Sequence, residues 1–212
     1  GVHAFDESPN AVNPSNGWVQ NTNNWPYSVT GASSPRPENY PPYMDAGSEN
    51  PRGIHAIMVL DGTTDFTVQS LNDAAYDSYL TAFEPLVPAL VADWDRTPDS
   101  DPLKGALAEP IELLRGWDLR WSVESVPTAI AVFWGEELMR RTRGAARDAG
   151  LSAYDYMATD AARGERLAAL SAASQRLEED FGAWRTPWGD INRFQRLTGD
   201  IDHPFDDAGP SI

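Results

Sequence analysis

The stretch PTAIAVFWGEELMRR, residues 127–141, is the most apolar helix-forming segment of the chain. Its apolar side chains recur at helical spacing, so one face is predicted to point into a core; these are Ile130, Phe133, Trp134 and Leu138. Pro127 suits the first turn of a helix. The basic pair Arg140–Arg141 suits the negative end of a helix dipole. The segment therefore predicts a buried helix that ends near residue 141.

Further helical patterns flank this segment on both sides. The sequence predicts a helix from Val68 to Phe83, a break at Pro85 and Pro88, and then a second piece that reaches Trp94. Two more helices are predicted over 103–114 and 160–181, the second with a common face of Leu167, Leu170, Leu177 and Phe181. Ser152 and Asp155 are spaced as in a capping box.

The first 64 residues have a different composition, rich in Asn, Pro, Gly and Ser. Their prolines forbid long helices, and short strands are expected at GWVQ (17–20) and IHAIMVL (54–60). After Trp184, TPWGDINRF (186–194) predicts a turn and then an extended run. The expected fold is mainly α with a few short strands at both ends. It divides into a loop region (1–64), a helical lobe (65–183) and a return segment (184–212).

Charge and composition exclude several classes of function. The 212 residues carry 32 acidic and 16 basic side chains, a formal net charge of -16, which argues against a nucleic-acid partner. No apolar run reaches the length of about 18 residues that a membrane span needs. There is no cysteine. His3, His55 and His203 lie far apart in sequence, and DGTTD (61–65) lacks the distal Glu of a calcium loop.

The remaining candidate for chemistry is the loop NPSNGWVQNTNNWPYS, residues 13–28, in which five asparagines surround two tryptophans. An Asn side chain offers a neutral NH₂ donor, which suits an oxyanion hole. Asparagines also form turns, and this simpler explanation is expected for Asn13, Asn16 and Asn24. In an extended loop Asn21 and Asn23 would point the same way, so alternation does not separate them. Trp18 and Trp25 are substrate-binding candidates together with Asn21, although Trp18 can equally pack.

NPSNGWVQNTNNWP resembles the segment NP-x-x-G-[aromatic]-[aliphatic]-x-N-x-N in the β chain of penicillin acylase family enzymes, which are N-terminal-nucleophile hydrolases. The segments 50–71, 113–138 (which contains LLRGWD) and 184–194 resemble further parts of that chain in the same order. The likeness is greatest to the acyl-homoserine-lactone acylase branch. It implies a four-layered αββα sandwich of class α+β for the whole protein, and a periplasmic or secreted location.

The resemblance also implies a mechanism for cleaving the amide bond of N-acyl compounds. An N-terminal serine attacks the carbonyl, and a loop Asn holds the oxyanion; matching the motif from Gly17 assigns this role to Asn23. The family's active-site arginine falls on Arg52, which otherwise would be a surface residue in a local salt bridge. Residue 1 is Gly, so the serine is expected outside this chain, which alone should be inactive.

The implied partners are a small-molecule amide, the remainder of the β subunit and the α subunit. No cofactor is expected; calcium occurs in the family, but the sequence offers no clear ligands for it. An alternative of another class is a non-catalytic module that binds a sugar or peptide through the Asn and Trp side chains of residues 13–43.

Overall fold

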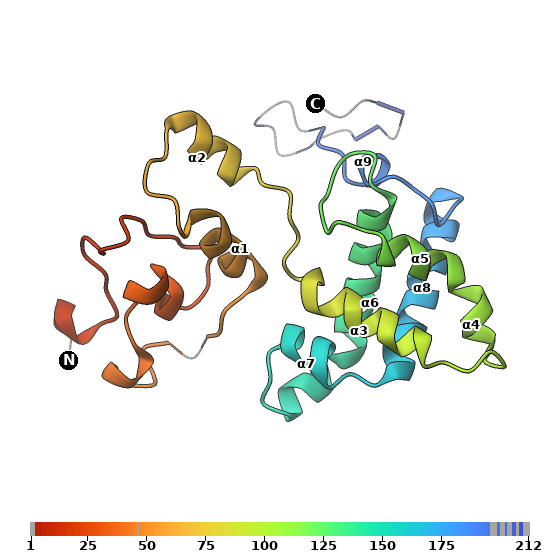
Figure 1. The fold of residues 1–212 in the computed structure, drawn as a ribbon, viewed down its shortest axis with the longest axis horizontal. Coiled ribbons are helices and arrows are strands. Elements are labelled where there is room, and N and C mark those ends of the chain that lie inside the picture. Colours follow the sequence, from red (N-terminus) through yellow and green to blue (C-terminus); the bar gives the residue numbers. More distant parts are fainter. Residues whose placement is uncertain are drawn as a thin grey trace. The chain divides into compact units, whose positions relative to one another are not determined.

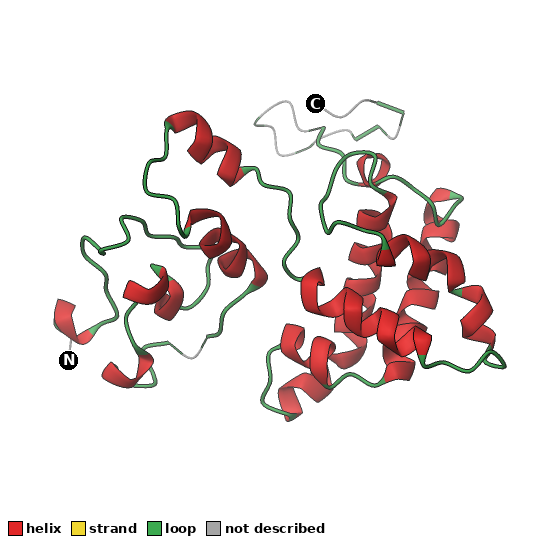
Figure 2. Cartoon of the chain, in the orientation of Figure 1, coloured by secondary structure: helices red, strands yellow, loops and turns green. Residues whose placement is uncertain are grey.

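The computed structural model describes residues 3–45, 47–195, 199, 202, 205, 206, 208 and 209. The chain divides into two compact units, residues 1–82 and 83–212. Helices joined by loops make up both units (Figure 2), and within the described residues β-type pairing is confined to the single residues Tyr79 and Arg120. The mainly α prediction is confirmed, whereas the strands predicted at both ends are not supported.

The second unit contains the core, built around the long helix α6 (Val126–Asp148). α6 packs against α8 (Arg163–Phe181) and α7 (Ala153–Thr159), and α3 (Phe83–Asp95) packs against α8 (Figure 1). The shorter helices are α4 (Pro102–Ala106), α5 (Ala108–Arg115) and α9 (Trp188–Ile191). Fully buried side chains join these helices, among them Leu90, Ile111, Ile130, Trp134, Leu138, Leu170 and Leu177.

The predicted face of α6 is confirmed, but the helix is longer than predicted. The Ser125 hydroxyl caps its start by accepting from the Thr128 N–H, with Pro127 in the first turn. Because the helix continues to Asp148, Arg140 and Arg141 do not interact with its C-terminus as predicted. Both instead donate to the Glu137 carboxylate at 2.7 Å.

The prolines of α3 do not interrupt it, which corrects the predicted break. Pro85 occupies the first turn, where a missing N–H costs nothing, and Pro88 lies inside the helix. An internal proline costs about 3 kcal/mol. Burial of the apolar face (Phe83, Leu86, Val87 and Leu90) offsets this cost.

A buried ion pair connects α3 to α8. Arg166 donates to an Asp93 carboxylate oxygen at 2.7 Å, and the two side chains are 6% and 4% exposed. The remaining guanidinium nitrogens donate to the carbonyls of Met157 and Ala158, both at 2.9 Å. Each group of this pair therefore has partners, as buried charges require.

The first unit has two helices, α1 (Pro51–Leu60) and α2 (Val68–Ala75), with four 3₁₀ turns at Phe5–Glu7, Pro26–Ser28, Gly31–Ser33 and Pro37–Asn39. IHAIMVL forms most of α1, so its predicted strand is wrong. The predicted helix 68–83 ends at Ala75, because the following segment bonds elsewhere. Thr81 donates to the Pro51 carbonyl at 2.6 Å, and Asp77 pairs with His55 at 3.0 Å.

The other predictions at the C-terminal side have mixed outcomes. The predicted turn and extended run of 186–194 contain the short helix α9. Phe181 of the predicted α8 face is 42% exposed, while Leu167, Leu170 and Leu177 are buried. Ser152 caps α7 by accepting from the Asp155 N–H at 3.1 Å.

His203 lies outside the described residues. No helix in the described part of the chain is long and apolar enough to cross a membrane.

Candidate functional site

The Asn-rich loop is held in shape by a buried threonine. Thr30 is fully buried, its hydroxyl lies 2.6 Å from the Asn16 side-chain oxygen, and its carbonyl accepts from the Asn16 amide at 2.9 Å. The Gln20 N–H donates to the Val29 carbonyl at 2.8 Å. Asn16 is therefore a clamp across the loop rather than the local turn former that was predicted.

A second set of bonds joins the loop to the start of α1. The Asn50 side chain caps this helix by accepting from the Gly53 N–H at 2.9 Å. Its amide also donates to the Thr22 carbonyl at 3.3 Å. Asn24 donates to Glu49 at 2.8 Å and to the Ser28 hydroxyl at 3.0 Å. Residues 22–24 of the loop are thereby fixed against the helix start.

Gly53 allows this close approach of helix and loop. A Cβ atom at position 53 would overlap the Glu49 carboxylate and would lie 2.6 Å from the Asn24 amide nitrogen. A larger residue at position 53 would therefore displace the ends of the Glu49 and Asn24 side chains from their present positions. The contact was not foreseen from the sequence, although Asn50 followed by Pro51 is a recognisable N-cap and first-turn signal.

Asn23 has a left-handed backbone conformation, with φ of 59°. Its N–H donates to the Asn21 side-chain oxygen at 2.8 Å, which forms an Asx turn. The extended geometry considered for residues 21–24 is therefore wrong at Asn23. Its side chain is exposed, and no group of the described residues hydrogen-bonds it. The Asn23 carboxamide is thus free to bind another molecule, unlike that of Asn24.

Arg52 lies in the first turn of α1, and its side chain is exposed. Within the described part of the chain it makes no ion pair, so the local salt bridge considered as its alternative role is not formed there. A cation at a helix N-terminus gains nothing from the helix dipole. Arg52 lies two residues after Asn50, and Asn23 directly follows Thr22. The hydrogen bond between Asn50 and Thr22 therefore joins the segment of Arg52 to the segment of Asn23.

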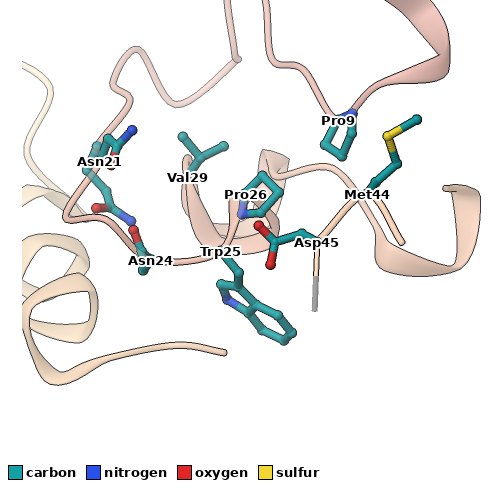
Figure 3. Close-up of a pocket in the computed structure, with 9 residues that line it drawn as sticks. Pro9, Asn21, Asn24, Trp25, Pro26, Val29, Met44 and Asp45 are labelled. Carbon is teal, nitrogen blue, oxygen red and sulfur yellow. The ribbon is translucent and has the colours of Figure 1, made fainter. Parts of the chain in front are cut away.

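The two tryptophans of the loop are half-buried. Trp18 lies over Gly31, where an added Cβ would be 3.3 Å from the ring. Trp25 contacts Tyr27 edge to face, with ring centroids 5.5 Å apart. Trp25, Asn21 and Asn24 also line a cavity of about 320 Å³ (Figure 3). Of the predicted substrate-binding residues, Asn21 and Trp25 thus border a cavity, while Trp18 packs against its own loop.

Metal ligands do not converge at this site. Across the described residues, no group of three or more His, Asp or Glu side chains could hold an ion. His3 pairs with Glu7 at 3.3 Å and bonds Tyr43 at 3.1 Å, and His55 pairs with Asp77. The residues described here therefore do not fit a calcium site of their own.

A family profile covers almost the whole of this chain. No curated protein matches this sequence. The sequence profile of the family described as penicillin amidase matches residues 1–208. This range includes the Asn-rich loop, α1 and all helices of the second unit. The chain therefore belongs to the penicillin amidase family, and its function is of the amide-hydrolase type.

Proposed function

We propose that this chain contributes part of the active site of an amidase with an N-terminal serine nucleophile, and that Asn23 donates a hydrogen bond to the oxyanion. The supporting observation is the free Asn23 carboxamide on a loop whose neighbours are fixed by hydrogen bonds. A fixed neutral donor stabilises negative charge that develops only in the transition state. The serine and the acyl pocket come from polypeptide outside these 212 residues.

Arg52 is proposed to orient the substrate and the catalytic groups. Its guanidinium is exposed, and no carboxylate of the described residues neutralises it. It lies two residues after Asn50, whose side chain bonds to the loop beside Asn23. This position suits a cation that acts on a molecule bound at the loop.

The burial pattern supports the proposal that further polypeptide completes the first unit. All the described apolar side chains that are buried belong to residues 83 onward. Among the described residues of the first unit, nine large apolar side chains are exposed, namely Phe5, Val12, Val19, Tyr43, Ile54, Met58, Val68, Leu71 and Tyr76. A unit without an apolar core gains stability by packing against other chain. We assign this role to the remainder of the β subunit and the α subunit, in an αββα sandwich.

The substrate class is proposed from the family. N-acyl compounds such as penicillins or acyl-homoserine lactones present one amide between an acyl group and an amine. The likeness of the loop to the acyl-homoserine-lactone branch favours the second class. A periplasmic or secreted location accompanies this proposal. The 212-residue chain by itself is expected to be inactive, because the nucleophile is supplied from elsewhere.

Replacing Asn23 tests the proposal in the full-length enzyme. Asn23→Ala is expected to lower kcat by about 10²–10³-fold, the usual effect of losing one oxyanion donor. Asn13→Ala is the matched control, because Asn13 is also exposed and has a positive φ of 46°. Initial rates on a chromogenic N-acyl amide and thermal unfolding should be measured for both variants. A near-normal kcat for Asn23→Ala would assign the role to another donor.

A further inference from the structure

The Asn-rich loop contains the sole Asn–Gly pair of the sequence, Asn16–Gly17. In such a pair the glycine nitrogen can attack the asparagine side chain with little steric hindrance, because glycine carries no Cβ. Gly17 is exposed and has a φ of 77°. Apart from its chain neighbours, no atom of the described residues lies within 4 Å of the place that a Cβ would occupy. Packing around Gly17 therefore does not block the reaction.

The reaction replaces the Asn16 amide in two balanced steps. The Gly17 nitrogen bonds to the Asn16 Cγ carbon, the Cγ–Nδ2 bond breaks, and the amide nitrogen leaves as ammonia with the proton of the Gly17 N–H. Water then opens the resulting cyclic imide at one of its C–N bonds. It adds a hydroxyl to the carbonyl carbon and a proton to the nitrogen, which yields aspartate or isoaspartate at position 16.

In the folded loop, hydrogen bonds occupy both reacting groups. The Asn16 amide donates to the Thr30 carbonyl at 2.9 Å, and the Asn16 side-chain oxygen lies 2.6 Å from the Thr30 hydroxyl. The Gly17 N–H donates to the Pro14 carbonyl at 3.0 Å. Before the nitrogen can attack, the Gly17 N–H must leave its acceptor and the Asn16 carboxamide must turn out of both bonds to Thr30.

Thr30 is itself fixed, so it cannot follow a moving Asn16 side chain. It is fully buried, and its N–H donates to the Ser34 hydroxyl at 2.9 Å. Its hydroxyl also lies 2.7 Å from the Trp18 carbonyl. Each opening of the loop at Asn16 therefore breaks the bonds to Thr30 outright, and the reactive arrangement is reached only by such local opening.

We propose that Asn16 is a deamidation site and that its bonds to Thr30 keep it unreactive in the folded protein. The modified residue cannot re-form these bonds, because a carboxylate has only acceptors and would face the Thr30 carbonyl, which is also an acceptor. Deamidation therefore releases the clamp between residues 16 and 30 irreversibly. This inference is independent of the proposed amidase function.

The first test compares the folded and the unfolded states of the full-length protein in mildly alkaline buffer. Mass mapping of proteolytic peptides, with fragmentation to locate the residue, follows the loss of the Asn16 amide. This loss is expected to be at least about tenfold faster in concentrated guanidinium chloride, because the bonds to Thr30 are absent there. Equal rates in the two states, or no loss in the denaturant, would overturn the inference.

Variants of Thr30 test whether its bonds are the cause of the protection. Thr30→Val has nearly the same shape but no hydroxyl, and should speed deamidation of the folded protein by about tenfold. Thr30→Ser retains the hydroxyl and should keep the wild-type rate. Thr22→Val is the matched control in the same loop: the Thr22 hydroxyl donates to Asn50 at 3.4 Å and not to Asn16, so the rate should not change.

Thermal unfolding of each variant separates loss of the clamp from loss of the fold. If Thr30→Val does not fold, Ser34→Ala takes its place; it removes the acceptor of the Thr30 N–H and should speed deamidation by a smaller factor. An unchanged rate in the folded variant would overturn the proposal. Equal acceleration by Thr22→Val would show that general mobility of the loop sets the rate, and the protecting role of Thr30 would then be wrong.

Discussion

At the scale of single residues, asparagines in a similar sequence context have different structural roles. Asn16 and Asn24 hold the loop through bonds to residues distant in sequence, Thr30 and Glu49, whereas no group in the described part of the chain bonds to the Asn23 side chain. The sequence motif singled out Asn23, but the clamping roles could not be predicted from it. They depend on which distant residue meets each amide in the folded chain, and the local sequence contains no signal for that.

Glu137 is a residue whose contribution depends on pH. The hydrogen bond from Arg140, assisted by that from Arg141, lowers the Glu137 pKa from 4.5 to about 2. A depressed folded-state pKa stabilises the fold above the unfolded value, and this stabilisation is lost as the pH falls from about 4.5 towards 2. Glu137→Gln should therefore cost about 1 kcal/mol of unfolding free energy at pH 7, since Arg140 is exposed.

Urea unfolding of wild type and Glu137→Gln between pH 3 and 7 measures the difference in their unfolding free energies. This difference should narrow as the pH drops below about 4.5. Glu136→Gln provides the control, because the Glu136 carboxylate is exposed and makes no ion pair within the described chain. A gap that stays constant with pH would mean that the Glu137 pairs do not stabilise the fold.

At the scale of elements, the helices of the second unit were largely predictable and their interruptions were not. Apolar spacing identified α6 and α8, whose faces bury Trp134 and Leu170. The prolines of α3 and the apolar run of α1 were misinterpreted. In α3 tertiary burial outweighs the lost hydrogen bond. In α1 a short apolar run fits both a strand and a helix, and the Asn50–Pro51 start decides between them.

The contact between α3 and α8 makes a prediction about stability. Asp93→Asn leaves the Arg166 guanidinium buried without its counter-charge, which should cost about 3–5 kcal/mol. Arg96→Gln removes the other partner of Asp93, an arginine side chain that is 67% exposed, and should cost less than about 1 kcal/mol. Chemical unfolding of the two variants gives both values. Equal losses of unfolding free energy for the two variants would show that burial does not account for the contribution of the Asp93–Arg166 pair to stability.

At the scale of the whole molecule, the two units differ in what stabilises them. Polar bonds hold the described parts of residues 1–82 together, around buried groups such as Gln20 and Thr30. Residues 83–212 contain an apolar core. The sequence prediction placed a boundary near residue 64, whereas the two units divide between residues 82 and 83, so α2 belongs to the first unit. The absence of buried apolar side chains from the described first unit became visible only with the structure, because its apolar content resembles that of a folded domain.

Expressing the two units separately tests this difference. Residues 83–212 should unfold cooperatively in urea, because their core lies within the unit. Residues 1–82 should show no cooperative transition and should bind a dye specific for apolar surface. A sharp unfolding transition for residues 1–82 alone would show that the polar bonds of this unit suffice to fold it cooperatively.

The proline inside α3 has a consequence for the order in which the second unit folds. Pro88 removes one of the few hydrogen bonds that a 13-residue helix can use to form by itself, so α3 is a poor nucleus. The helices α6 and α8 carry no internal proline and can associate first. α3 then acquires its helical form as it docks, which makes its contacts late events on the folding path. Weakening those contacts should speed unfolding while leaving the refolding rate nearly unchanged.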